Sequence, residues 1–255
     1  MTYSFPCQDL SLAGKGKGMA DTSTRSGMLW EVERILNELE TLNQLPQVLL
    51  MENVPQVHGM DNVEDFNKWQ LALEKLGYKN YFQDLIATDY GIPQTRNRCF
   101  MISILGDYSY TFPKPIPLKL KLNDLLEKNV NEKFYLSDKQ IKCLSSDKVY
   151  NNGYIRGNQF KKNINPDVCT TITASSSDRA SDTFISIQTT PKEGVCYNDL
   201  KIRKLTPLEC FRLMGVKDED YYKIAKNQSN SSLYHLAGDS IVVNVLMAIF
   251  KELIK

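Results

Sequence analysis

Apolar residues at helical spacing mark two segments near the start of the chain. Steps of three and four residues place side chains on one side of a helix, where they can pack against a sheet. The second segment ends at Gly77, a residue suited to the left-handed backbone that often follows a helix. The sequence therefore predicts helices over residues 28–42 and 66–76. Their apolar positions are Met28, Val32, Ile35, Leu36, Leu39 and Leu42 in the first, and Phe66, Trp69, Leu73 and Leu76 in the second.

Short apolar runs alternate with these helices and predict buried strands. One run covers residues 47–51 and delivers Glu52 at its carboxyl end, and two further runs cover residues 81–87 and 99–105. Strands that alternate with helices indicate a parallel α/β sheet, in which ligands bind beyond the carboxyl ends of the strands. We therefore expect Glu52 at the ligand-binding edge of the sheet.

The chain changes character after about Tyr108, where a Pro- and Lys-rich stretch leads into a polar region with weak periodicity. Regular structure returns at residues 206–209, where Thr-Pro-Leu-Glu forms a capping box with proline at the first helical position, and Gly215 is expected to end that helix. Residues 241–253 are apolar on most faces and predict a buried helix, entered through Gly-Asp-Ser at residues 238–240.

Composition narrows the possible partners of the chain. The 31 Lys and Arg residues nearly balance 30 Asp and Glu residues, giving a net charge of +1, so any nucleic-acid site must be a local basic surface. The 6 cysteines include no Cys-x-x-Cys pair and only 2 histidines accompany them, so we expect neither a bound metal nor a disulfide framework. The sequence shows no signal peptide and no apolar run of membrane-spanning length, so we expect a cytoplasmic protein without membrane contact.

Cys7 is the candidate nucleophile. It follows Pro6 at the end of a short apolar start and leads into the Gly- and Lys-rich loop at residues 13–18. A lone cysteine is more often a packing residue, but here proline fixes the backbone before the thiol and the glycines permit a loop that closes over a ligand. Lys15 and Lys17 favour the thiolate if they approach the sulfur.

A carboxylate and two arginines complete a candidate catalytic set. Glu52 could equally be an ordinary strand-end carboxylate, and the sequence around Arg96 and Arg98 could be a surface turn. However, the two arginines alternate on the approach to an apolar strand, so their side chains should project to the same side. A thiol, a carboxylate and a guanidinium together suit attack on an electron-poor ring.

Five motifs, in this order, resemble the cytosine-5 DNA methyltransferase family. The resemblance covers nearly the whole chain and implies an α/β fold, with part of the Rossmann-like sheet of S-adenosylmethionine-dependent methyltransferases and a smaller loop- and β-rich target-recognition region. It divides the chain into a catalytic region at 1–108, a target-recognition region at 109–200 and a C-terminal segment at 201–255 that returns to the catalytic domain. The motifs are Phe-Pro-Cys-Gln at 5–8, Glu-Asn-Val at 52–54, Gln-Thr-Arg-Asn-Arg at 94–98, Arg-Lys-Leu-Thr-Pro-Leu-Glu-Cys-Phe-Arg-Leu-Met-Gly at 203–215 and Gly-Asp-Ser at 238–240.

The resemblance also implies a mechanism on duplex DNA. Cys7 would attack carbon 6 of a flipped-out cytosine, and Glu52, protonated at that moment, would bond ring nitrogen 3. Arg98 would hold the cytosine carbonyl oxygen, whereas Arg96 would order the loop or a phosphate. The methyl donor would be S-adenosylmethionine. Further positions implied are Pro6, Asp239 and Ser240 for the cofactor, and Gln8, Ser11, Arg25 and Thr171 for DNA.

The sequence departs from the family pattern in two ways. It lacks the N-terminal Gly-rich turn and acidic residues that bind S-adenosylmethionine, so we expect a missing N-terminal half; a split enzyme, a truncated gene and a fragment remain open. Asp239 stands where the family usually has asparagine, which places a carboxylate near the cofactor. The first hypothesis is the modification part of a bacterial restriction-modification system, and the alternatives are a catalytically silent DNA-binding remnant and an RNA cytosine methyltransferase.

Overall fold

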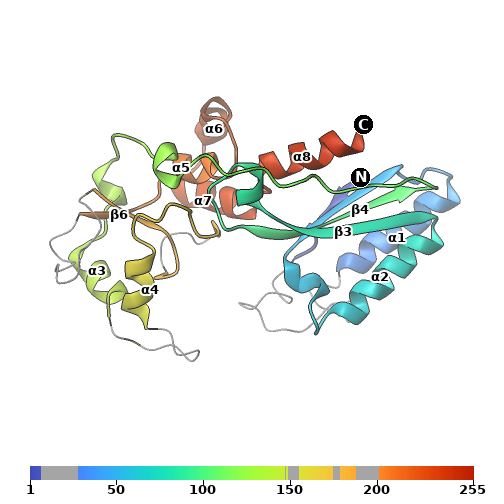
Figure 1. The fold of residues 1–255 in the computed structure, drawn as a ribbon, viewed down its shortest axis with the longest axis horizontal. Coiled ribbons are helices and arrows are strands. Elements are labelled where there is room, and N and C mark those ends of the chain that lie inside the picture. Colours follow the sequence, from blue (N-terminus) through green and yellow to red (C-terminus); the bar gives the residue numbers. More distant parts are fainter. Residues whose placement is uncertain (7–27, 147, 149–154, 175–178, 188–200) are drawn as a thin grey trace. The chain divides into compact units, whose positions relative to one another are not determined.

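The computed structural model describes two compact units, shown in Figure 1. The described residues are 1–6, 28–146, 148, 155–174, 179–187 and 201–255. The first unit comprises Met1–Leu85, Asn97–Lys114 and Ile249–Lys255, and the second comprises Ile86–Arg96 and Pro115–Ala248. These units follow packing, so the functional division at residues 109–200 stays a prediction.

A four-stranded sheet organises the first unit. Its strands are β1 (Thr2–Tyr3), β2 (Val48–Asn53), β3 (Tyr78–Ile86) and β4 (Asn97–Leu105), in the order β1-β2-β4-β3. β1 is parallel to β2, whereas β2 is antiparallel to β4, so the sheet is mixed and the expectation of a parallel sheet is wrong. The neighbours β3 and β4 are joined by ten residues that carry only the 3-10 helix η3 (Ala87–Tyr90), which is shorter than the crossover of a dozen or more residues that a parallel pair needs.

Helices α1 (Leu29–Thr41) and α2 (Val63–Lys75) cover one face of this sheet (Figure 1). Because side chains alternate between the faces of a strand, odd-numbered residues of β2 and β4 join this core and even-numbered residues point to the opposite face. The core cluster comprises Phe5, Leu29, Leu36, Leu49, Met51, Val54, Val57, Phe66, Trp69, Leu73, Tyr78, Cys99 and Met101.

Both helices of the first unit are confirmed, but the buried face of α1 differs from the predicted one. Leu36 is buried, whereas Met28 and Leu42, at the ends of the predicted stripe, are 55% and 61% exposed. The sequence carries a second apolar row that starts at Leu29, and this row faces the sheet. In α2 the predicted face is correct, and Gly77 follows the helix with φ of +90°.

The second unit contains α3 (Asp138–Leu144), α4 (Arg156–Lys162) and the antiparallel pair β5 (Phe184–Ser186) and β6 (Ile202–Lys204). The pattern of apolar residues predicts neither α3 nor α4, because seven-residue helices carry too few apolar repeats to stand out. The 3-10 helices η4 (Leu122–Leu125) and η5 (Glu132–Phe134) precede them. A core cluster joins α3, α4, β5 and β6, and it comprises Ile141, Leu144, Phe160, Ile164, Ala180, Phe184 and Ile202.

Four helices form the C-terminal part: α5 (Pro207–Arg212), α6 (Asp218–Ala225), α7 (Asn230–Asp239) and α8 (Val243–Leu253). The capping box that begins α5 is confirmed, since Thr206 and Glu209 each bond the other's backbone, and Gly215 follows with φ of +76°.

The predicted helix near the C-terminus is confirmed as α8, but it is not buried on most faces. Met247 is 66% exposed and Phe250 is 43% exposed, whereas Val245 and Ile249 are buried. Asn230–Leu253 is long enough and, with a mean hydropathy of 1.6, apolar enough to cross a membrane. However, residues 240–242 divide this stretch into α7 and α8, and several of its side chains are buried in the protein core. Its length and composition alone therefore do not assign it to a membrane.

Candidate active site

The ends of three strands bring the first candidate residues together. β1 pairs with β2 through Tyr3 and Met51, so the chain that leaves β1 continues beside the end of β2. Ser4 Oγ donates to Glu52 Oε2 at 3.3 Å, and Asn53 Nδ2 donates to the carbonyl oxygen of Phe5 at 3.1 Å. These bonds fix the segment that leads to Pro6 beside the carboxyl end of β2, at the edge of the sheet formed by the strand ends, where Glu52 lies.

Glu52 and Arg98 form an ion pair at this edge. Because β4 is antiparallel to β2, its first residues lie beside the last residues of β2. Arg98 Nε lies 3.1 Å from Glu52 Oε1, and the two side chains are 19% and 11% exposed. Arg98 Nη1 also donates to the carbonyl oxygen of Asn97 at 2.7 Å. The structure therefore brings together the carboxylate and the guanidinium that the sequence singled out.

The predicted nucleophile lies next to this edge in the sequence but outside the described residues. Pro6 is half-buried and directly precedes Cys7. Three predicted DNA-contacting residues, Gln8, Ser11 and Arg25, also lie outside the described residues.

Three of the other cysteines are unsuited to the role of nucleophile. Cys99, Cys169 and Cys210 are buried. Burial raises the pKa of the Cys169 thiol to about 12, and it also raises the pKa of Cys99 and of Cys210. Since the thiolate is the nucleophilic form, these three thiols are poor nucleophiles at neutral pH. Cys143 is exposed and its sulfur lies 3.3 Å from Arg156 Nη1.

Arg96 has a different environment from Arg98. It directly precedes β4, whereas Arg98 lies within that strand. Its side chain is buried, and its guanidinium donates to the carbonyl oxygens of Ile172 at 2.9 Å, Gly238 at 3.0 Å and Ser240 at 2.7 Å. Arg96 thus connects the segment before β4 to two distant parts of the second unit.

Gln94 strengthens the same connection, and sequence reasoning gave it no role. Its side chain is completely buried; Oε1 accepts a hydrogen bond from the Ile172 amide at 2.9 Å, and Nε2 donates to the Leu213 carbonyl oxygen at 2.7 Å. An amide side chain can donate and accept at once, so it bridges two backbones. Thr171, a predicted DNA contact, is half-buried beside Ile172. The sequence did contain a signal for Gln94, and for Asn53 beside Glu52, because both residues lie within the family motifs named above.

The two predicted cofactor residues at the end of α7 differ in exposure. Asp239 is exposed, whereas Ser240 is half-buried and its hydroxyl donates to the carbonyl oxygen of Leu236. Before them, Gly238 packs so closely that a Cβ there would lie 2.2 Å from the backbone nitrogen of Ala174. Only glycine permits this approach, which fixes the end of α7 against residues 173–174.

We expect Arg96→Ala to lower the free energy of unfolding by about 3 kcal/mol or more, because three carbonyl oxygens, bonded in buried or partly buried positions, lose their donor. Arg96→Lys should recover only part of this loss, since an ammonium cannot reproduce the planar fork of donors. Urea unfolding followed by circular dichroism measures both. The exposed Lys161→Ala is the control, with an expected change within about 0.5 kcal/mol. An Arg96→Ala protein as stable as this control would show that these bonds contribute little.

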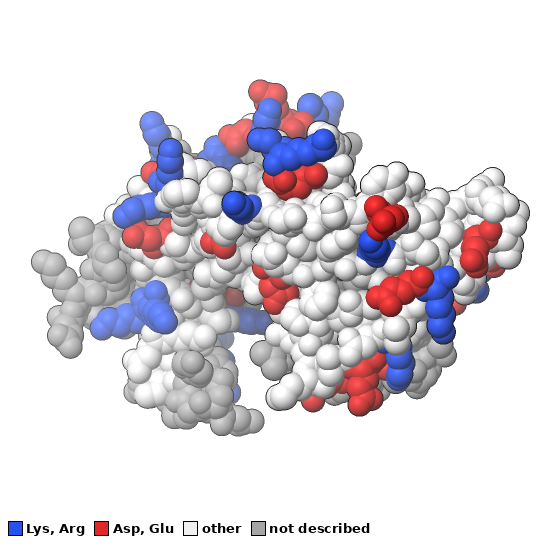
Figure 2. Space-filling model, turned by 45° about the vertical axis from the view of Figure 1, so that its right-hand side comes forward, with Lys and Arg blue, Asp and Glu red and all other residues white. Residues whose placement is uncertain are grey.

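Charges of both signs are interspersed on the face shown in Figure 2. Several of the exposed charges pair locally, as in Arg34 with Glu31 at 2.8 Å and Lys223 with Asp220 at 2.8 Å. The pattern on this face agrees with the near-zero net charge of the chain. A polyanion would therefore need a local basic cluster, and Lys161 and Lys162, exposed in the last turn of α4, are one pair available for it.

Comparison with known proteins shows which family the chain resembles. Residues 1–255 match the family described as C-5 cytosine-specific DNA methylase. The chain is 41% identical over 260 residues to Type II methyltransferase M2.ScrFI of Lactococcus lactis subsp. cremoris, covering 100% of this chain and 66% of that protein. It is 36% identical over 272 residues to orphan methyltransferase M.SssI of Spiroplasma monobiae, covering 99% and 65%. The chain therefore spans slightly less than two thirds of the length of these relatives.

A solved structure shares the fold. The methyltransferase EhMeth of Entamoeba histolytica superposes with a TM-score of 0.75 at 18% identity, covering 99% of this chain and 77% of that one. The predicted α/β methyltransferase fold is thereby confirmed.

Proposed function

Because the chain belongs to the C-5 cytosine-specific DNA methylase family, we propose that it carries the nucleophile and the DNA-reading part of an enzyme that methylates carbon 5 of cytosine in duplex DNA. The observation that supports this most directly is the meeting of Glu52, Arg98 and the Phe5–Pro6 segment at one sheet edge. A carboxylate and a guanidinium held beside the approach to a cysteine are the groups that nucleophilic addition to a pyrimidine ring requires.

In the proposed reaction the Cys7 thiolate adds to carbon 6 of a cytosine that has been flipped out of the duplex. The ring electrons that this addition displaces make carbon 5 nucleophilic. S-adenosylmethionine, when bound, supplies the methyl group that carbon 5 takes. Loss of the proton from carbon 5 then allows the bond between Cys7 and carbon 6 to break, which restores the aromatic ring and the free thiolate.

Glu52 and Arg98 would stabilise the charge that moves through the ring. Glu52 would donate a proton or a hydrogen bond to ring nitrogen 3, and Arg98 would donate to the carbonyl oxygen of the base. Their 3.1 Å contact with each other supports a shared location for these roles, since it holds both groups at one place before a base enters. Charged groups that are already oriented need little reorganisation during the reaction.

Arg96 would act as a positioning residue, not a catalytic one. Its buried guanidinium already bonds three backbone carbonyls, which supports the loop-ordering role over contact with a phosphate. The same contacts hold Ile172, so Thr171 would present a fixed backbone to DNA. We keep Gln8, Ser11, Arg25 and Thr171 as the proposed DNA contacts.

We further propose that activity needs a cofactor-binding half, on the same polypeptide or on a partner. The residues present fit only part of S-adenosylmethionine: the exposed Asp239 carboxylate and Ser240 can meet its charged and polar groups, and Pro6 stays a predicted cofactor contact. The described residues include no Gly-rich strand-to-helix turn. Among the described residues, β1 is an outermost strand of the sheet and pairs with β2 alone. Phe250 and Ile254 of the same unit are 43% and 84% exposed, which adds apolar surface for such a half to cover.

The names of the relatives suggest the biological setting. M2.ScrFI is a type II methyltransferase, and we propose that this chain belongs to the modification part of a bacterial restriction-modification system in the cytoplasm.

Methyl transfer from labelled S-adenosylmethionine tests the proposed function. The chain is assayed alone and with the part of M2.ScrFI that the chain does not match, against duplex DNA and a folded RNA of equal length. We expect transfer to duplex DNA in the combined reaction. Preference for the RNA would instead favour an RNA cytosine methyltransferase, and sequence-specific DNA retention in gel shifts with no transfer in any combination would favour a silent remnant.

A further inference from the structure

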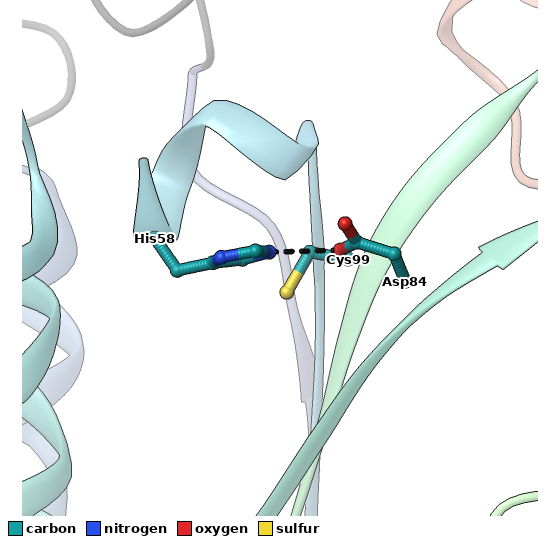
Figure 3. Close-up of side chains that lie close together, drawn as sticks. All are labelled: His58, Asp84 and Cys99. Atoms are coloured by element: carbon teal, nitrogen blue, oxygen red, sulfur yellow. Dashed lines mark hydrogen bonds and ion pairs between the residues drawn. The ribbon is translucent and has the colours of Figure 1, made fainter. Parts of the chain in front are cut away.

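Three side chains able to bind a metal lie close together (Figure 3). Strand alternation places Cys99 on the sheet face opposite Glu52 and Arg98. His58 ends the 3-10 helix η2 (Pro55–His58), Asp84 lies in β3, and Cys99 lies in β4. His58 Nε2 lies 2.9 Å from Asp84 Oδ1, and the imidazole nitrogen, a carboxylate oxygen and the Cys99 sulfur all lie within 4.8 Å of one another.

The strand register explains why Asp84 and Cys99 meet. Ser103 Oγ of β4 donates to Asn80 Oδ1 of β3 at 2.7 Å. Asp84 follows Asn80 by four residues and Cys99 precedes Ser103 by four, so the second pair lies on the same sheet face as the first. Cys99 belongs to the core cluster under α1 and α2, which separates it from the proposed catalytic pair by the thickness of the sheet.

We propose that His58, Asp84 and Cys99 form a binding site for a divalent transition metal of the zinc class, with water completing the coordination. Metal–ligand bonds of about 2.0–2.3 Å place the ligands of a tetrahedral ion about 3.5 Å apart. The observed separations, 2.9 Å for one pair and below 4.8 Å for all, bracket this value, so small side-chain rotations suffice. Imidazole, thiolate and carboxylate are the three ligand types that zinc combines in proteins.

The surroundings of the three side chains are apolar on one side and open to solvent on another. The rings of Phe66 and Phe82 lie 6.0 Å and 5.4 Å from the His58 ring and shield it on the apolar side. The side chains of His58 and Asp84 are 28% and 31% exposed, so an ion can arrive from solvent. Burial, followed by the Asp84 carboxylate, raises the pKa of the Cys99 thiol. A bound dication favours the thiolate, and the thiol proton leaves to solvent as the metal–sulfur bond forms.

Metal binding would join η2 to the β3–β4 pair. η2 follows β2, which contains Glu52, and Cys99 follows Arg98 in β4, so an ion there would stabilise the two strands that present the proposed catalytic pair. The sequence predicted no metal site because the three ligands are far apart in the chain and come from three different elements.

Cobalt(II) absorption tests the site on the full 255-residue chain. We expect one equivalent of Co²⁺ to give a thiolate-to-metal charge-transfer band and the visible bands of a four-coordinate ion, both removed by excess Zn²⁺. Cys99→Ser should lose the charge-transfer band, whereas the exposed Cys143→Ser should keep it. Zn²⁺ should also raise the melting temperature of the unaltered chain.

His58→Gln and Asp84→Asn keep the test decisive if Cys99→Ser does not fold, because both side chains are partly exposed. Each should weaken Co²⁺ binding by more than about tenfold and remove the Zn²⁺-dependent rise in melting temperature. The proposal is overturned if the unaltered chain gives no charge-transfer band, if Cys99→Ser retains it, or if both partly exposed variants bind Co²⁺ as the unaltered chain does. His58 and Asp84 would then form only a hydrogen bond.

Discussion

Glu52→Gln is expected to lower the rate of methyl transfer to duplex DNA about 10²–10⁴-fold, the range typical of a lost general acid. Glutamine has nearly the same size, and its carbonyl oxygen can still accept from Arg98, so the strand ends should keep their places. What the variant loses is the proton that a carboxylic acid can transfer to ring nitrogen 3, since an amide can donate only a hydrogen bond. Single-turnover kinetics with the cofactor-binding half present should show the loss in the chemical step, with DNA affinity unchanged.

A matched control separates this effect from a general loss of charge. Glu31→Gln removes a carboxylate from α1, where the side chain is 62% exposed, and should leave the rate unchanged. A Glu52→Gln enzyme that transfers methyl groups at the unaltered rate would remove Glu52 from the mechanism. A parallel fall in DNA affinity and rate would assign it to DNA binding instead.

Arg203→Met is expected to lower the free energy of unfolding by roughly 3–5 kcal/mol, because it leaves a buried carboxylate without its counter-ion. Arg203 Nη1 and Nη2 each lie 2.8 Å from one oxygen of Glu209, and the two side chains are 4% and 0% exposed. Glu209 also accepts hydrogen bonds from the backbone amides of Thr206 and Glu127. The pair therefore joins β6, the start of α5 and the segment after η4.

An exposed ion pair near Arg203 provides the control. Lys201 and Glu132 lie 3.9 Å apart with side chains 67% and 83% exposed, so Lys201→Met should change the free energy of unfolding by at most about 1 kcal/mol. The double variant Arg203→Met, Glu209→Gln should recover part of the loss, since the amide keeps a hydrogen-bond acceptor without the buried charge. Urea unfolding that shows equal effects for Arg203→Met and Lys201→Met would contradict the importance of burial.

Local patterns in the sequence predicted the elements that depend on neighbouring residues. The capping box at Thr206 and Glu209 acts within one helical turn, and the apolar face of α2 repeats over a few turns. Motif order also singled out Glu52 and Arg98, which the structure places 3.1 Å apart. Their assigned chemistry came from the family resemblance, because a strand-end carboxylate alone has no distinctive spacing.

Long-range pairing was outside the reach of these patterns. An apolar run is similar whether its neighbour in the sheet is parallel or antiparallel, so the direction of β4 relative to β2 was missed. The partners of Arg96 lie more than seventy residues away, and His58, Asp84 and Cys99 meet only through the sheet. Such contacts depend on tertiary structure, which a local period does not encode.

Trapping of the covalent intermediate tests the central claim most directly. Duplex DNA with 5-fluorocytosine at the target position should form a stable adduct with the chain when the cofactor-binding half and S-adenosylmethionine are present, because fluorine at carbon 5 cannot leave as a proton does. Mass spectrometry should place the adduct on the peptide that contains Cys7, with no adduct in Cys7→Ala and an unchanged yield in Cys143→Ala. Failure to form any adduct, or an adduct that persists in Cys7→Ala, would contradict the assignment of Cys7 as the nucleophile.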